Sequence, residues 1–195
     1  MQADEAKSIF ERVGAVRHGH FELSSGRHSS TYVQCALVLQ YPDLAERLGR
    51  ALADKFREAS IDCVVSPALG GILVGHEVAR GLGVRAIFVE RDSSGRMALR
   101  RGFTLQPAEK VLVVEDVWTT GGSTRETMSI VEQTGGRVVA AAALIDRSGG
   151  RMELAVPARA LIEINIPSYE QFDCPQCHAG EAITKPGSHF VRSEA

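Results

Sequence analysis

Short apolar runs that alternate with helix-like segments constrain the fold of this chain more than any other feature of its sequence. Four such runs follow one another, each largely unbroken by polar residues: Cys63–Val65, Val84–Val89, Val111–Val114 and Val138–Ile145. Runs of this kind are typical of strands that are buried on both faces, as in parallel sheets. Helical patterns lie between them, so the sequence predicts an α/β protein with a mainly parallel sheet flanked by helices.

The segments outside this alternation complete the expected order of elements. Helices are predicted over residues 3–16 and 42–59, where apolar residues recur at helical spacing. A polar stretch rich in glycine and serine, residues 21–30, is expected to be a loop that leads into a short strand at residues 31–34. Residues 161–164 are expected to add a strand at the edge of the sheet.

Composition and charge narrow the class of protein. The 195 residues include 22 Lys and Arg against 24 Asp and Glu, a net charge of −2, which lacks the basic excess typical of proteins that bind nucleic acid. The longest apolar run is far shorter than the roughly 20 residues that span a bilayer, and the acidic start of the chain lacks a signal pattern. We therefore expect one cytoplasmic domain over residues 1–195, with no nucleic-acid or membrane partner.

The segment after the third apolar run carries the clearest functional signal. Two adjacent carboxylates, Glu115 and Asp116, follow this run, and a turn rich in hydroxyls and glycines, residues 119–124, then opens a helix. Ligands of open α/β sheets bind beyond the carboxyl ends of strands, and a helix N-terminus offers N–H groups to an anion. The pattern predicts a phosphate site. Because carboxylates repel phosphate, we expect the acidic pair to face ribose hydroxyls, hydrated Mg²⁺ or a developing positive charge.

A simpler interpretation of this segment is a strand that ends in a polar turn, with Ser123 as the helix cap. Residues 113–124 nevertheless resemble the phosphoribosyl diphosphate (PRPP) signature of type I phosphoribosyltransferases. The resemblance implies that Thr119 to Ser123 hold the 5-phosphate, while Glu115 and Asp116 hold the ribose hydroxyls. The implied PRPP-binding residues are Glu115, Asp116, Val117, Trp118, Thr119, Thr120, Gly121, Gly122 and Ser123.

Two further segments concern the acceptor base. Residues 21–32 resemble the N-terminal hood of orotate phosphoribosyltransferases, where Ser25 and Gly26 would contact the polar edges of a flat ring. Arg147 ends the fourth run and can hold a carboxylate in bidentate fashion; orotate carries one, whereas adenine, hypoxanthine and uracil do not. The resemblance therefore places Arg147, together with Thr119, at orotate. A solvated loop and a surface ion pair are the structural alternatives.

Two other segments would handle the diphosphate. One resembles the pyrophosphate loop of the family and consists of Ala68, Leu69, Gly70 and Gly71. Residues 90–101 take the place of the family's flexible catalytic loop, in which we expect Arg91 and Arg96 to act on the diphosphate as catalytic residues beside the acidic pair. Family members carry lysines where Ser24 and Gly70 stand, and lysines and a histidine in the flexible loop. Arginine replaces the charge of lysine but not its proton, which leaves the general acid unassigned.

The resemblance as a whole implies transfer of the phosphoribosyl group from PRPP to orotate, with Mg²⁺ bound mainly through PRPP and no direct protein ligand. It also implies a homodimer, a core over about residues 42–166, and a small hood formed by about residues 18–35 and the C-terminal tail. A purine or uracil phosphoribosyltransferase and a non-enzymatic regulator that senses PRPP are the alternatives. The regulator would be expected to carry a DNA-binding module, and no segment predicts a helix-turn-helix.

The tail beyond Tyr169 predicts no regular element and contains two cysteines, Cys174 and Cys177, followed by His178. The Cys-x-x-Cys-His pattern matches haem attachment, which usually requires export. A zinc site needs four ligands, and the other histidine in the tail is His189. We favour a surface turn here, with a metal site or a local disulfide as alternatives.

Overall fold

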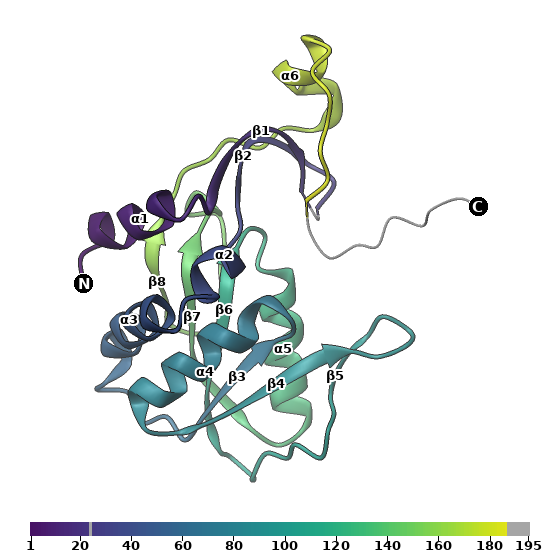
Figure 1. Cartoon of the computed structure of the whole chain (residues 1–195). Coiled ribbons are helices and arrows are strands. Elements are labelled where there is room, and N and C mark those ends of the chain that lie inside the picture. Colours follow the sequence, from purple (N-terminus) through teal and green to yellow (C-terminus); the bar gives the residue numbers. More distant parts are fainter. Residues whose placement is uncertain (24, 187–195) are drawn as a thin grey trace. The chain divides into compact units, whose positions relative to one another are not determined.

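A six-stranded sheet forms the centre of one of the two compact units into which the chain divides (Figure 1). The computed structural model describes residues 1–23 and 25–186, and this unit comprises residues 1–15 and 35–165. The strands, in their order across the sheet, are β5 Met97–Leu99, β4 Arg85–Arg91, β3 Cys63–Pro67, β6 Lys110–Trp118, β7 Arg137–Asp146 and β8 Ala158–Glu163. All neighbours are parallel except β5, which pairs antiparallel with β4. The predicted mainly parallel α/β fold is confirmed, and β8 is the predicted edge strand.

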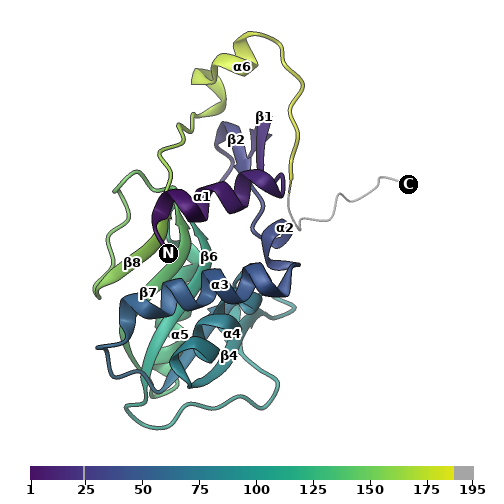
Figure 2. The same ribbon diagram turned by 60° about the vertical axis from the view of Figure 1, so that its left-hand side comes forward.

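Helices cover both faces of this sheet. They are α1 Ala3–Arg12, α2 Ala36–Leu39, α3 Pro42–Ala53, α4 Gly70–Leu82 and α5 Gly122–Gln133, with a 3₁₀ turn, η1, at Asp54–Phe56. The connection from β3 through α4 leads toward one side of the sheet, and that from β6 through α5 leads toward the other. Because such crossovers are right-handed, α4 and α5 lie on opposite faces. Helix α3 packs beside α4 (Figures 1 and 2).

Two helices end earlier than their sequence patterns predict. Helix α1 ends at Arg12 because Gly14 adopts a left-handed φ of +68° and Ala15 donates its N–H to the carbonyl of Phe10 at 2.9 Å. This is the Schellman ending that glycine favours. Helix α3 ends at Ala53, and the chain tightens into η1 instead of continuing to residue 59.

The core centres on β6, which lies between β3 and β7. Residues Val111–Val114 of this strand have no exposed surface. Met128 and Val131 of α5 pack in the same apolar cluster as Val111 and Val113. The end of β6 therefore lies between two neighbouring strand ends, the position at which open α/β sheets bind ligands.

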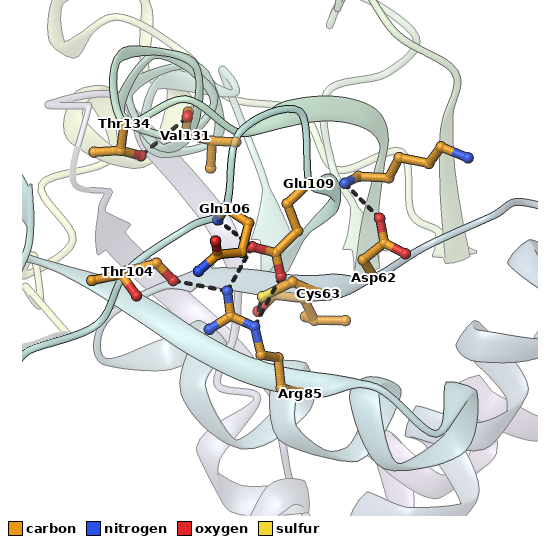
Figure 3. A network of polar contacts seen from close by, with 10 residues as sticks. Asp62, Cys63, Arg85, Thr104, Gln106, Glu109, Val131 and Thr134 are labelled. Carbon is orange, nitrogen blue, oxygen red and sulfur yellow. Dashed lines mark hydrogen bonds and ion pairs between the residues drawn. The ribbon is translucent and has the colours of Figure 1, made fainter.

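A polar network lies at the other end of the strands, where β3, β4 and β6 begin (Figure 3). Arg85 donates two hydrogen bonds to Glu109, at 2.9 and 2.7 Å, and one to the carbonyl of Thr104 at 2.8 Å. Asp62 accepts the N–H of Lys110 at 2.9 Å. These bonds tie the loop before β6 to the start of β4, so this edge has a structural role.

The second unit comprises residues 16–34 and 166–195. Its strands β1 Val16–Glu22 and β2 His28–Val33 form an antiparallel hairpin, so the loop predicted over residues 21–30 is wrong: its ends belong to strands. The tail contributes the 3₁₀ turn η2, Gln171–Asp173, and the short helix α6, Pro175–His178. Within the described part of the chain, no helix is both long and apolar enough to cross a membrane.

Candidate active site

The end of strand β6 carries the two predicted carboxylates. The strand continues past Val114 to Trp118, so Glu115 and Asp116 lie inside it. Successive side chains of a strand point to opposite faces, and the two carboxylates differ accordingly. Glu115 is 8% exposed and accepts the N–H of Asp116 at 3.2 Å, while Asp116 is half-buried and accepts the N–H of Val117 at 2.9 Å.

The burial of Glu115 affects the pKa of its carboxyl group. Desolvation, and then the nearby charge of Asp116, raise the pKa of Glu115 well above its ordinary value. A buried carboxyl with a raised pKa is typical of functional sites. Asp116 is therefore the more accessible negative charge of the pair.

The turn after β6 presents the start of helix α5. Trp118 is buried and donates its Nε1–H to Thr124 Oγ1 at 3.0 Å, which anchors the turn to the first turn of the helix. Gly121 stands at the N-cap with a left-handed φ of +76°. The alternative with Ser123 as the cap is therefore wrong, because Ser123 lies inside α5.

The left-handed backbone conformation favours glycine at position 121. A Cβ atom there would lie 2.8 Å from the Sδ atom of Met152. Because glycine has no side chain, the cap position supplies no oxygen to the first N–H groups of α5. Three residues of the turn, Thr120, Gly122 and Ser123, are exposed and Thr119 is half-buried. A helix start with exposed N–H groups and no capping side chain is a common type of anion site.

The neighbouring strand ends bring further predicted residues to the same edge. After β3, a Cβ atom on Gly70 would lie only 2.7 Å from Asp116 Oδ2, so the predicted pyrophosphate loop, residues 68–71, lies next to Asp116 at this position. After β7, the backbone N–H of Arg147 donates to the carbonyl of Trp118 at 2.8 Å, and its side chain is 7% exposed. The bond between Ala68 and Leu69 is a cis peptide.

The predicted loop arginines lie on the hairpin of β4 and β5. Residues 90–101 form the end of β4, a turn and β5, at the edge of the sheet. Arg91 pairs with Glu126 of α5 at 2.9 Å, and Arg96 is exposed and bonds to Ser94 Oγ at 3.0 Å. A hollow of about 590 Å³ between this hairpin and α5 is lined by both arginines and by Glu126.

The predicted hood residues belong to the second unit. Ser25 and Gly26 are exposed in the turn between β1 and β2. Ser24 lies outside the described residues. Their assignment to orotate stays a prediction.

Sequence reasoning missed one neighbour of the acidic pair, Cys35. Its side chain is fully buried and its Sγ lies 3.8 Å from the carbonyl oxygen of Asp116. Burial, followed by the charges of Asp116 and Glu115, raises the pKa of the Cys35 thiol well above its usual value. The thiol is therefore an uncharged group that packs against the backbone of Asp116. A lone cysteine in a sequence gives no signal of such a position.

The parallel sheet, the acidic end of its central strand and the glycine turn at a helix start define a phosphoribosyltransferase. Residues 37–176 match the phosphoribosyl transferase domain, and the chain belongs to this family. An orotate phosphoribosyltransferase from Pelotomaculum thermopropionicum is 53% identical over 98% of this chain and 100% of its own length.

Two solved structures show the same fold. Orotate phosphoribosyltransferase from Aeropyrum pernix is 25% identical, with a TM-score of 0.65 over 81% of this chain and 93% of that one. Adenine phosphoribosyltransferase from Rhodothermus marinus is 23% identical, with a TM-score of 0.62 over 81% of this chain and 99% of that one. The fold therefore does not by itself select the acceptor base.

Proposed function

We propose that this chain is an orotate phosphoribosyltransferase. It transfers the phosphoribosyl group of PRPP to orotate, giving orotidine 5′-monophosphate and diphosphate, a step of de novo pyrimidine (UMP) biosynthesis. The observation that carries the proposal is the 53% identity to an enzyme of that name over the whole length of that enzyme. The gathering of residues 68–71, Asp116 and the turn after β6 at one sheet edge supports it.

The turn after β6 holds the 5-phosphate of PRPP in this proposal. The N–H groups at the start of α5 and the hydroxyls of Thr119, Thr120 and Ser123 donate to the phosphate. Trp118 keeps the turn against α5, and Val117 links it to the acidic pair. Asp116 accepts hydrogen bonds from the ribose hydroxyls, and it stabilises the positive charge that develops on the sugar.

Glu115 supports this role from a buried position. Its oxygen already holds the backbone N–H of Asp116 at 3.2 Å. This contact orients the strand end on which Asp116 stands. We propose that Asp116 acts on the sugar and that Glu115 completes the acidic pair beside it.

The loop of Ala68, Leu69, Gly70 and Gly71 binds the diphosphate through backbone N–H groups. In the homodimer proposed below, Arg91 and Arg96 of the partner subunit reach this site and neutralise the charge of the diphosphate. Mg²⁺ is held mainly by PRPP. The residues present fit this ion, because the half-buried carboxylate of Asp116, next to Gly70, can accept hydrogen bonds from the water ligands that Mg²⁺ usually keeps. When bound, Mg²⁺ lowers the cost of the charge that grows on the leaving diphosphate.

Orotate is held by Arg147 and Thr119, with Ser25 and Gly26 contacting the ring. The position of Arg147 at the end of β7, next to the acidic strand end, supports its role. The guanidinium forms a fork that matches the carboxylate of orotate.

We also propose that the chain forms a homodimer and works in the cytoplasm as a single domain built from both units. The buried, unbridged cysteines Cys35 and Cys63 support a reducing compartment.

Turnover tests the proposed function directly. The fall in orotate absorbance is followed with purified protein, PRPP and Mg²⁺, with adenine, hypoxanthine and uracil as alternative acceptors and an Asp116→Asn variant as the control. We expect turnover with orotate alone and its loss in the variant. Turnover of another base would indicate a purine or uracil enzyme. Tight PRPP binding with no turnover of any base would indicate a regulator.

A further inference from the structure

Four potential metal ligands meet in the second unit. In the sequence they are distant from residues 115–123, which are proposed to bind PRPP. His20 Nε2 lies 3.0 Å from His28 Nδ1, and His28 Nδ1 lies 3.2 Å from Cys177 Sγ. His20 Nε2 also lies 3.5 Å from Cys174 Sγ and 3.6 Å from Cys177 Sγ. All four ligand atoms lie within 4.8 Å of one another, and in the described residues they form the one such group of His, Cys, Asp or Glu.

The backbone brings these side chains together by specific local features. Strand β1 has a register shift between His18 and Phe21, which leaves both His20 and Phe21 buried although they are adjacent. A bulge of this kind re-aims a side chain. His28 begins β2 and pairs with Tyr169 of the tail.

The cysteines are placed by the short helix α6. Cys174 is its N-cap and Cys177 lies in its single turn, so both sulfurs can face one point. Cys174 is buried like the two histidines, and Cys177 is partly exposed. Neither cysteine forms a disulfide, so both thiols are available as ligands.

The spacing of the four atoms fits a tetrahedral ion. Zn–S bonds of about 2.3 Å and Zn–N bonds of about 2.0–2.1 Å place ligand atoms roughly 3.3–3.8 Å apart in a tetrahedron. The nitrogen–sulfur distances of 3.5 and 3.6 Å agree, whereas the third, 3.2 Å, and the nitrogen–nitrogen distance of 3.0 Å are slightly short. A set of two thiolates and two imidazoles is typical of zinc.

A second contact prepares His20 for this role. Its Nδ1 lies 2.9 Å from the carbonyl oxygen of Glu181, so Nδ1 carries the proton and Nε2 keeps its lone pair for a metal. Histidine ligands of metals are commonly oriented by such a bond to a carbonyl. The contact also ties residue 181 of the tail to β1.

We propose that His20, His28, Cys174 and Cys177 bind one structural Zn²⁺ ion. Four protein ligands close the coordination sphere, which is characteristic of structural rather than catalytic zinc. The proposal follows the metal-site alternative to a surface turn, with a ligand set that the sequence did not predict. His178 instead directs its Nε2 to the carbonyl of Phe172 at 2.8 Å, and His189 lies outside the described residues.

The second unit has a small apolar core, so a bound ion would add to its stability. Its described buried apolar side chains, apart from Cys174, are Phe21, Leu23, Val33 and Ile166. An isolated two-stranded hairpin is marginally stable in water, and small units commonly rely on a metal or disulfides. The ion would join the hairpin to a tail segment about 150 residues later, with Cys174 and His20 separated by 154 positions.

Metal analysis of the full-length protein tests the proposal. Protein without a histidine tag is purified in buffers free of chelators, its metal content is measured, and its zinc environment is determined by X-ray absorption spectroscopy. We expect about one zinc per chain, bound by two sulfurs and two nitrogens at the distances of a structural site. Folded protein that neither contains zinc nor binds added Zn²⁺ would overturn the proposal, as would another ligand set or a disulfide between Cys174 and Cys177.

Variants identify the ligands. We expect Cys177→Ser and His28→Gln to lose at least about nine-tenths of the bound zinc, because a four-ligand site needs every ligand. The matched control is His178→Gln, which changes a histidine next to Cys177 and should keep its zinc. Equal loss of zinc in the control, or full zinc in both ligand variants, would overturn the assignment. Should the ligand variants fail to fold, the absorption spectrum of the unaltered protein still decides the ligand set.

Discussion

At the scale of single residues, the two carboxylates of β6 are neighbours in sequence with unlike chemistry. Glu115 is buried and its pKa is raised, whereas Asp116 is half-buried and meets the start of α4 at Gly70. The sequence predicts an acidic pair but not this division. The difference arises from which face of the strand each side chain occupies, and only packing determines that.

Because the pKa of Glu115 is raised in the folded chain, the free energy of unfolding should fall as the pH rises. Above the ordinary carboxyl pKa of 4.5, the unfolded chain releases this proton while the folded chain retains it, so the free energy of unfolding decreases until the folded pKa is passed. Glu115→Gln cannot titrate and should raise the melting temperature, more at pH 8 than at pH 5. Thermal unfolding of both proteins at the two pH values measures this. A lower melting temperature of the variant at pH 8 would contradict it.

Arg147 should affect orotate more than PRPP. Since a hydrogen bond to a charged group contributes about 1.5–3 kcal/mol, Arg147→Ala should raise the KM for orotate at least about tenfold and leave that for PRPP nearly unchanged. Steady-state kinetics measure both constants. Because Arg147 is buried, the melting temperature must be recorded as a control. An equal rise in both KM values would remove its role at the orotate carboxylate.

At the scale of elements, the ends of the strands determine the site. The apolar run predicts that the third strand ends at Val114. In the structure, Glu115 still pairs with Ala143, and Trp118 with Asp146, of β7. Backbone hydrogen bonds form a ladder whatever the polarity of the side chains, so an apolar pattern shows where a strand is buried rather than where it ends. The hairpin of β1 and β2 was missed for the same reason.

Gly121 tests the turn that joins β6 to α5. Gly121→Ala forces a non-glycine residue into the left-handed region, which costs about 1–3 kcal/mol, and brings its Cβ against Met152. A domain of this size loses about 2–4 °C of melting temperature per kcal/mol, so we expect a loss of several degrees.

The matched control for this prediction is Gly122→Ala. A Cβ there meets only Thr120 Oγ1, at 3.7 Å, and the φ angle is ordinary. Its melting temperature should stay within about 2 °C of the unaltered protein, since ordinary contact costs little. Equal losses in the two variants would show that the left-handed conformation is not what position 121 requires.

At the scale of the whole molecule, the proposed homodimer with a shared site can be tested by mixing. Arg91→Ala and Asp116→Asn variants should each be inactive alone. If the loop of one chain serves its partner's site, random pairing leaves about a quarter of all sites intact, so the mixture should regain roughly that share of activity. A mixture that forms dimers but stays inactive would show that each loop serves its own chain, and a monomer in solution would exclude the homodimer.

The fold class and the place of the turn before α5 could be predicted from the sequence, because both depend on residues close together in the chain. Apolar runs such as Val111–Val114 report their own burial, and residues 119–124 combine a turn with a helix start. Which residues from distant parts of the chain come into contact depends on how the elements pack. The contact of Gly70 with Asp116 and the meeting of His20 and His28 with Cys174 and Cys177 depend on strand order, a bulge and a short helix, whose effects no local pattern records.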